Sequence, residues 1–215
     1  MRQNNLVYNV YLPSFKTQNI AMEYTQKIKA AIHMAIRVHE LDQKQKRKGK
    51  DIPYIIHPLI VGLILSRISH DEDIIVAGLL HDTVEDSLDT KKVTVSVIKR
   101  RFGAKVARIV SDVTESKREL PWVDHKSATV KKLSVMAQDS LLVKSADVIA
   151  NCTELLADFR KEGDSTFRRF NVPKDHLIQH YVETIEELIR LWPDHPLRKD
   201  LDFHLSEVRG MYGMY

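Results

Sequence analysis

Three polar residues stand where the hydrophobic pattern of the sequence calls for apolar side chains. His81 and Asp82 directly follow the apolar run 74–80, and Asp147 lies inside the apolar stretch 141–150. An ionised carboxylate in a protein core costs more free energy than the net stability of a domain unless a cation compensates it. The two aspartates and the neighbouring histidine therefore indicate a metal site.

A further histidine completes the candidate set. His57 precedes Pro58, and because proline favours the first position of a helix, we expect His57 at a helix N-terminus. The set supplies two imidazole nitrogens and two carboxylate oxygens: His57, His81, Asp82 and Asp147. Such donors suit Mn²⁺, Fe²⁺, Zn²⁺ or Mg²⁺. Taken singly, each residue also has an ordinary explanation, since a lone histidine beside an apolar run is more often a satisfied core residue.

The amino-acid composition excludes several classes of protein and of site. The 215 residues contain ten histidines and one cysteine, Cys152, which rules out a disulfide framework and a zinc cluster built from cysteines. Hydrophobic residues make up 43% of the chain and charged residues 29%, which is typical of a globular protein. We interpret Cys152 as a helix-packing residue.

Charge and hydropathy indicate where the protein works and what it binds. The longest apolar runs have seven residues, whereas a membrane span needs roughly 20. We expect no membrane partner and, without a secretory signal pattern at the N-terminus, a cytoplasmic location. A net charge of +4 is too mild to indicate a nucleic-acid partner. The segment 44–50 is a basic loop suited to holding phosphate.

Helical periodicity extends over nearly the whole chain, and no segment alternates as a strand would. We expect a buried helix at 74–80, a helix starting at Pro58, and further helices at about 17–41, 94–101, 104–115, 123–138, 140–159, 175–191 and 197–209. The polar stretch 161–174 would connect the last two helices to the rest. The sequence therefore predicts one all-α domain over residues 1–215, with a core at about 17–160 and a C-terminal extension of helices at about 173–209.

Four segments resemble the hydrolase domain of the RelA/SpoT family, which belongs to the HD metal-phosphohydrolase superfamily. They are YIIHP (54–58), AGLLHDTVED (77–86), RFGAKVARIVSDVTESK (101–117), and VKSAD (143–147) followed by Asn151. The resemblance implies an HD-domain helical bundle, one divalent metal, usually Mn²⁺, and removal of pyrophosphate from the 3′ position of guanosine tetra- or pentaphosphate, (p)ppGpp.

The resemblance also implies roles for individual residues. The family's metal ligands fall on His57, His81, Asp82 and Asp147. Its catalytic acidic pair falls on Glu85 and Asp86, which in a continuing helix would share the metal's face. One of the two carboxylates would act as the base for the water that attacks the phosphorus next to the ribose 3′ oxygen. Its substrate contacts fall on Arg47, Lys48, Lys144 and Asn151.

The resemblance departs at two positions. Val148 and Ala150 stand where many members have Arg and His, so two polar side chains near the nucleotide are missing. Two alternatives therefore stay open: the same chemistry on another nucleotide such as (p)ppApp or NADPH, and a non-catalytic nucleotide-binding regulator. The sequence does not determine the oligomeric state. We interpret the terminal segment 210–215, GMYGMY, as a disordered end rather than an interface.

Overall fold

The apolar helix expected at residues 74–80 lies at the centre of the fold. It is α3, Glu72–Leu80, and its residues from Ile74 to Leu80 are all buried. Four helices pack against it: α1 (Gln26–Ile36), α2 (Ile56–Ser66), α6 (Ala104–Val113) and α8 (Gln138–Glu162). A helix enclosed in this way must be apolar around its whole circumference, which explains its sequence.

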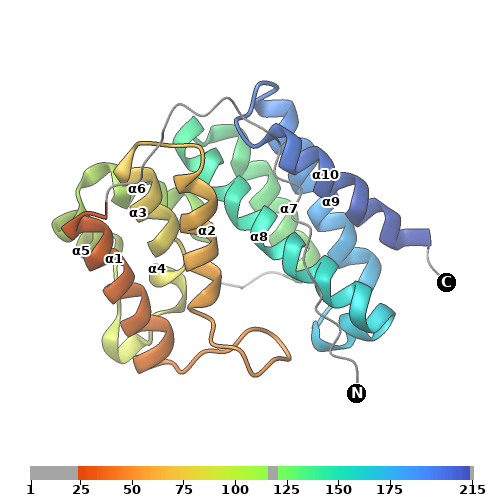
Figure 1. Cartoon of the computed structure of the whole chain (residues 1–215), viewed down its shortest axis with the longest axis horizontal. Helices are drawn as coiled ribbons and strands as arrows, with labels where there is room; N and C mark the ends of the chain where they lie inside the picture. Colours follow the sequence, from red (N-terminus) through yellow and green to blue (C-terminus); the bar gives the residue numbers. More distant parts are fainter. Residues whose placement is uncertain (1–23, 116–120, 214–215) are drawn as a thin grey trace, which may run out of the picture.

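The computed structural model describes residues 24–115 and 121–213 (Figure 1). Within these two ranges there is no strand, and the β pairing is limited to an isolated bridge between Lys46 and Pro53. The other α-helices are α4 (Thr83–Asp86), α5 (Val95–Phe102), α7 (Trp122–Lys132), α9 (Lys174–Leu191) and α10 (Arg198–Gly210). The all-α prediction is confirmed.

Close packing between α2 and α3 depends on a glycine. A methyl group added to Gly78 would lie 2.3 Å from Leu65 Cδ1, so a larger residue would force the fully buried Leu65 side chain to move. The close approach places the start of α2 beside the end of α3. The ring centroids of His57 and His81 consequently lie 5.1 Å apart.

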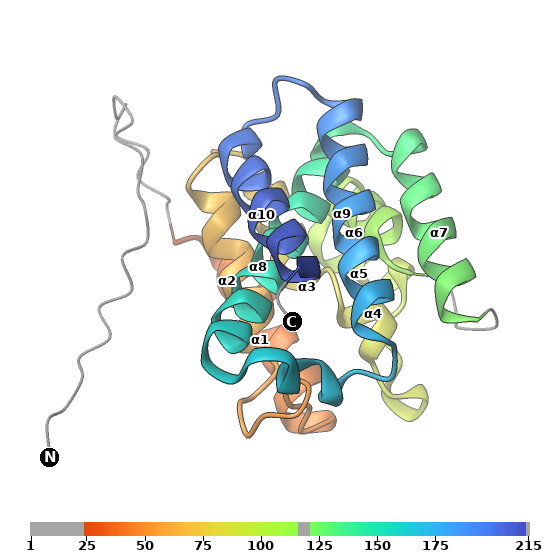
Figure 2. The same ribbon diagram turned by 90° about the vertical axis from the view of Figure 1, so that its right-hand side faces the viewer.

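The C-terminal helices α9 and α10 pack against each other and against α8 (Figure 2). After α10 the chain forms a 3₁₀ helix, Met211–Gly213, and Met211 is 1% exposed. The interpretation of segment 210–215 as a disordered end is therefore wrong at Met211, whose side chain joins the core. Residues 214–215 lie outside the described ranges.

The first helix differs from its predicted bounds. It begins at Gln26 because Thr25 caps it, with Thr25 Oγ1 accepting a hydrogen bond from the Ile28 N–H at 3.1 Å. After α1 the chain widens into a π-helix, Arg37–Asp42. Residues 17–23 of the predicted helix lie outside the described residues.

Other boundaries also differ. Pro58 is the third residue of α2 rather than the first, which leaves His57 inside the first turn. The segment 161–174 is not a simple polar connection, because α8 extends to Glu162. The chain also contains short 3₁₀ helices at Asp89–Lys91, Leu133–Val135 and Gly163–Arg169. The second of them replaces the end of the helix predicted at 123–138.

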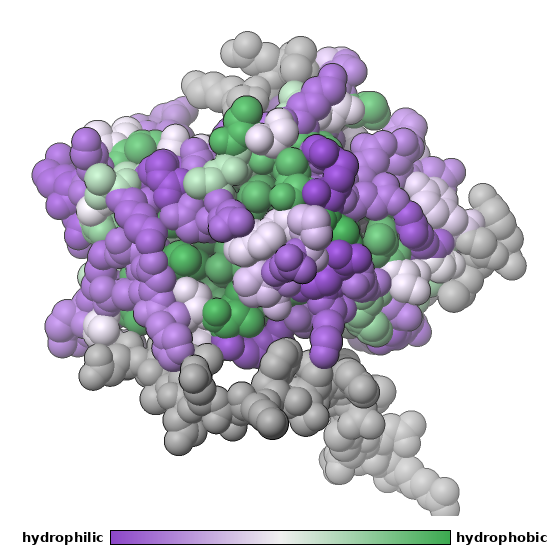
Figure 3. Space-filling view, turned by 90° about the horizontal axis from the view of Figure 1, so that it is seen from above, coloured by the Kyte–Doolittle hydropathy of each residue, from purple (hydrophilic) through white to green (hydrophobic). Residues whose placement is uncertain are grey.

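The surface is mixed in character. Seen from above, it is largely hydrophilic, with separate hydrophobic areas between the polar side chains (Figure 3). Several large apolar residues are exposed, among them Ile56, Ile60 and Leu63 of α2. Among the helices that the structure describes, none has the length and apolarity needed to span a membrane.

Candidate functional site

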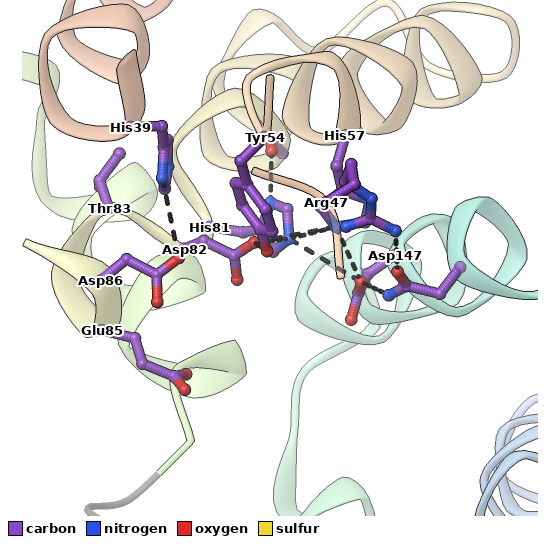
Figure 4. Close-up of polar contacts among 12 residues, drawn as sticks. His39, Arg47, Tyr54, His57, His81, Asp82, Thr83, Glu85, Asp86 and Asp147 are labelled. Atoms are coloured by element: carbon purple, nitrogen blue, oxygen red, sulfur yellow. Dashed lines mark hydrogen bonds and ion pairs between the residues drawn. The ribbon is translucent and has the colours of Figure 1, made fainter. Parts of the chain in front are cut away.

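Three of the four side chains proposed as metal ligands lie together, with one ligand atom each of His57, His81 and Asp147 within 4.8 Å of one another, and Asp82 lies beside His81 (Figure 4). His57 comes from the first turn of α2, His81 and Asp82 from the turn after α3, and Asp147 from α8. His57 Nε2 lies 3.2 Å from both His81 Nε2 and Asp147 Oδ1. His81 Nε2 lies 3.0 Å from Asp82 Oδ2. The fold thus gathers residues that are up to 90 positions apart in sequence, from 57 to 147.

These distances fit a shared divalent cation. The imidazole nitrogens lie 3.0 to 3.8 Å from the carboxylate oxygens of the set. Asp82 and Asp147 retain side-chain exposures of 20% and 13%, so they are less buried than the hydrophobic pattern predicted. The reason is that both side chains border a cavity.

Hydrogen bonds orient the ligand atoms toward that point. His81 Nδ1 lies 2.8 Å from the Gly78 carbonyl oxygen, which can only accept, so Nδ1 carries a proton and donates it. The lone pair of the neutral ring is then on Nε2, which faces the other ligands. Such outer contacts are typical of histidines that bind metals.

Three further residues contact the two aspartates. Tyr54 Oη donates to Asp82 Oδ2 at 2.6 Å. Lys144 Nζ donates to Asp147 Oδ2 at 2.9 Å, and Asn151 Nδ2 donates to Asp147 Oδ1 at 2.7 Å. Lys144 and Asn151, expected from the sequence to contact substrate, therefore contact a candidate ligand directly. Tyr54 was missed as a site residue, although it opens the YIIHP segment.

The charges of the cluster depend strongly on one another. Burial disfavours the charged imidazole of His81, but the carboxylates of Asp82 and Asp147 outweigh burial and raise its pKa to about 9. The pKa of Asp147 lies well below its usual value, because Lys144 and the two histidines outweigh burial. A bound cation would take the place of the proton on the histidine.

The acidic pair lies beside this cluster, on a different helix from the one expected. α3 ends at Leu80, the chain turns at residues 81–82, and Glu85 and Asp86 belong to the short helix α4. The prediction of a continuing helix is therefore wrong. Both carboxylates nevertheless border the same cavity as Asp82.

Burial and neighbouring acids raise the pKa values of the pair. Burial, followed by the charges of Asp82 and Glu115, raises the pKa of Glu85 to about 7. The backbone N–H of Glu115 donates to Glu85 Oε2 at 3.3 Å. The pKa of Asp86 is raised as well, by burial and then by the charge of Asp82. Glu85 can therefore exchange a proton near neutral pH.

The basic loop brings cations to the same place. Gly49, at φ +70°, turns the loop back against Arg169. The guanidinium of Arg47 lies over the Tyr54 ring, 5.3 Å from its centroid. Arg47 Nη2 donates to Asn151 Oδ1 at 2.9 Å. Lys48 Nζ lies 5.4 Å from the centroid of an aromatic ring, that of Phe170.

Two adjoining cavities border these residues. The first has a volume of about 360 Å³ and contains most of the proposed site: Gln45, Arg47, Lys48, Tyr54, Asp82, Glu85, Asp86 and Asn151 line it, among others. The second, of about 300 Å³, is lined partly by Trp122, Lys126, Asp147, Val148, Leu177 and His180. Both cavities share the side chains of Lys48, Asn151, Phe170 and Tyr181. The two cavities together form a cleft that reaches a candidate ligand from each side.

The aromatic residues of the cleft could not be found from the sequence. Trp122, Phe170 and Tyr181 line the second cavity but belong to no motif in the sequence, and aromatic residues are equally typical of a protein core. Of the two residues that depart from the RelA/SpoT pattern, Val148 lines the second cavity, whereas Ala150 is buried in the core. Cys152 is fully buried and packs in the core, as predicted.

Comparisons with known proteins agree with this geometry. A family model described as HD domain matches residues 31–170, more than half of the chain. The protein named guanosine-3′,5′-bis(diphosphate) 3′-pyrophosphohydrolase MESH1 from Homo sapiens is 34% identical over 192 residues, which cover 88% of this chain and 97% of that protein. A guanosine-3′,5′-bis(diphosphate) 3′-pyrophosphohydrolase from Aquifex aeolicus (strain VF5) is 36% identical over 143 residues, 65% of this chain and 19% of that longer protein.

A solved structure shares the fold. It is that of a metazoan ortholog of SpoT that hydrolyzes ppGpp, with a TM-score of 0.69 and 23% identity over 91% of this chain and 100% of that chain. The match with the HD-domain model and the identity with the human protein show the relationship independently of this likeness. The chain therefore belongs to the HD-domain family, as its resemblance to the RelA/SpoT hydrolases predicts.

Proposed function

We propose that the protein hydrolyses (p)ppGpp, removing the 3′-pyrophosphate and releasing GDP or GTP. The human relative that is similar over 88% of the chain is named for this activity. One observation carries the proposal: a cluster of His57, His81 and Asp147 meets, through Asp82 and Asp147, the cleft that the Glu85 and Asp86 carboxylates and the Arg47 guanidinium also line. This combination suits a substrate with several phosphates.

The metal site would be built from four residues of this chain: His57, His81, Asp82 and Asp147. We propose Mn²⁺ as the ion, because nitrogen and oxygen donors suit it. When bound, the ion would polarise a phosphoryl oxygen and lower the pKa of a water molecule. Tyr54, Lys144 and Asn151 hold the aspartates in place by the hydrogen bonds described above.

The acidic pair would move the proton. Glu85 or Asp86 accepts the proton of the water that attacks the phosphorus next to the ribose 3′ oxygen. The bond between that phosphorus and the 3′ oxygen breaks, and the carboxyl group returns the proton to the 3′ oxygen. A carboxyl with a pKa of about 7, as burial gives Glu85, suits both steps at neutral pH.

The basic loop would hold the nucleotide. Arg47 can donate to phosphate bidentately or stack on a base, whereas Lys48 supplies a point charge. Asn151 lies where it can contact ribose or base, since it lines both cavities. Lys144 donates a hydrogen bond to Asp147, so its ammonium group would contact the substrate only at a phosphate oxygen next to that carboxylate.

A second candidate keeps the chemistry and changes the nucleotide. Val148 lines the second cavity at a position where many RelA/SpoT hydrolases have Arg, so one polar contact to the base is absent. This favours testing an adenosine analogue, (p)ppApp, and NADPH as substrates. The single-domain organisation and the cytoplasmic location stay predictions from the sequence.

A panel of nucleotides tests the proposal. Protein loaded with Mn²⁺ is incubated with ppGpp, pppGpp, ppApp and NADPH, and the products are separated by chromatography. We expect GDP and pyrophosphate from ppGpp. Turnover of ppApp or NADPH alone would support the second candidate, and binding of ppGpp without turnover would show a regulator instead. An Asp147→Asn protein serves as the control for contaminating hydrolases.

A further inference from the structure

A buried histidine outside the ligand set lies beside the acidic pair. His39 is fully buried and belongs to the π-helix Arg37–Asp42. Short π-helical turns shift side chains from their regular α-helical positions and occur often at functional sites. Here the turn places His39 Nδ1 2.9 Å from Oε1 of Gln45.

Gln45 connects this histidine to Asp86. Its Nε2 donates to Asp86 Oδ2 at 3.0 Å, whereas His39 Nδ1 lies 3.7 Å from that oxygen. The side-chain amide of Gln45 therefore bridges His39 and the Asp86 carboxylate. The backbone of Gln45 is also held, because its N–H donates to the His39 carbonyl and its carbonyl accepts from the Tyr54 N–H, both at 2.8 Å.

The proton on the histidine determines which way the amide points. An amide oxygen can only accept, so His39 Nδ1 donates to Gln45 Oε1. The Asp86 carboxylate can likewise only accept, so the amide turns its NH₂ group toward Asp86 and its oxygen toward the Nδ1 proton of His39.

We propose that His39 is a positioning residue for the reaction: through Gln45 it anchors one oxygen of Asp86, so that the other oxygen faces the cleft. The inference rests on the proposed function in one respect, the role of Asp86 in the catalytic pair. His39 itself does not line the cleft, whereas Gln45 and Asp86 do. The expected role is to hold a carboxylate in place, since displacing a catalytic group by about 1 Å can cost on the order of 100-fold in rate.

Three variants separate this role from a structural one. His39→Leu removes the donor, and Gln45→Met keeps the length of the side chain without the amide. We expect each to lower kcat by on the order of 10- to 100-fold, with KM and bound Mn²⁺ unchanged. His39→Asn places an N–H close to the position of Nδ1 and should restore most of kcat. Glu40→Gln, in the same π-helix, is the control and should leave kcat unchanged.

A double variant tests the connection itself. If His39 acts through Gln45, the variant with both His39→Leu and Gln45→Met should be no slower than Gln45→Met alone. Losses that multiply, or a kcat within twofold of wild type in Gln45→Met, would overturn the inference. Gln45 lies in the loop, so its variant provides the answer where His39→Leu fails to fold.

Crystal structures decide the inference even if the proposed function fails. If the wild-type protein hydrolyses no nucleotide of the panel, the proposed function is wrong, and the position of Asp86 can still be compared. A rotated Asp86 carboxylate in Gln45→Met and a wild-type one in His39→Asn would support the positioning role. An unchanged Asp86 in Gln45→Met would contradict it.

Discussion

His81 donates a hydrogen bond from Nδ1 to the carbonyl oxygen of Gly78, 2.8 Å away at the end of the same helix. This bond fixes the tautomer of the ring and aims Nε2 at His57 and the two aspartates. The end of a buried helix thus supplies both a ligand and the group that orients it. The closest nitrogen pair of the site, His57 Nε2 and His81 Nε2, lies 3.2 Å apart as a result.

Loss of a metal ligand should weaken metal binding more than loss of a hydrogen bond to a ligand. Asp147→Asn removes a ligand and should weaken Mn²⁺ binding by more than about 100-fold, whereas Tyr54→Phe removes only an outer hydrogen bond and should weaken it by about 10- to 100-fold. Titration calorimetry with Mn²⁺ measures both. Equal affinity of wild type and Asp147→Asn would remove Asp147 from the ligand set.

The acidic pair should be needed for turnover and not for metal binding. Glu85→Gln and Asp86→Asn keep the size of each side chain and remove its ability to accept a proton. We expect a loss of kcat of at least about 100-fold, with one Mn²⁺ still bound per chain. Metal analysis after dialysis checks this point. Loss of the metal in either variant would instead identify that residue as a ligand.

Much of this site could be predicted because its ligands interrupt apolar helices. His81, Asp82 and Asp147 are polar at positions where the helical period calls for core residues, and that signal survives in a single sequence. The position of Glu85 could not be predicted in detail, because the turn after Leu80 has no glycine or proline to mark it.

The link from His39 to Asp86 was beyond sequence reasoning for another reason. It depends on a π-helix that follows α1 directly, and on a loop without periodicity. Gln45 is one polar residue among the basic residues of that loop, and nothing in its type shows which group it contacts. The buried central helix, by contrast, is apparent from seven consecutive apolar residues.

Stability should respond to a larger residue at Gly78. A Cβ there would lie 2.3 Å from Leu65 Cδ1 in the interface of α2 and α3. Gly78→Ala should therefore lower the free energy of unfolding by about 1–3 kcal/mol. Gly210→Ala is the matched control, because a Cβ at Gly210 meets no atom of the described residues within 4 Å. Urea unfolding compares the two, and an equally stable Gly78→Ala protein would contradict the packing argument.

Acid should destabilise the protein partly through His195. Its Nδ1 accepts from the Leu197 N–H at 2.9 Å and its Nε2 lies 3.0 Å from Ser145 Oγ. Burial lowers its pKa from 6.5 to about 4. Between these values the unfolded chain binds a proton that the native protein does not. The contribution of His195 to the free energy of unfolding is therefore fully present above pH 6.5 and is lost as the pH falls toward 4.

A variant isolates this contribution from other acid effects. His195→Gln cannot titrate, so its unfolding free energy should fall less steeply than that of wild type between pH 6.5 and 4. The difference in slope should approach one proton. Urea titrations at four or five pH values provide both curves. Parallel curves would show that His195 does not contribute to the pH dependence.

The position of bond cleavage tests the central claim most directly. Wild-type protein with Mn²⁺ is incubated with ppGpp in oxygen-18 water, and the oxygen-18 content of each product is measured by mass spectrometry. Attack on the phosphorus next to the ribose 3′ oxygen predicts one heavy oxygen in pyrophosphate and none in GDP. Heavy oxygen in the nucleoside product, release of single phosphates in place of pyrophosphate, or no reaction with Mn²⁺ present would contradict the account.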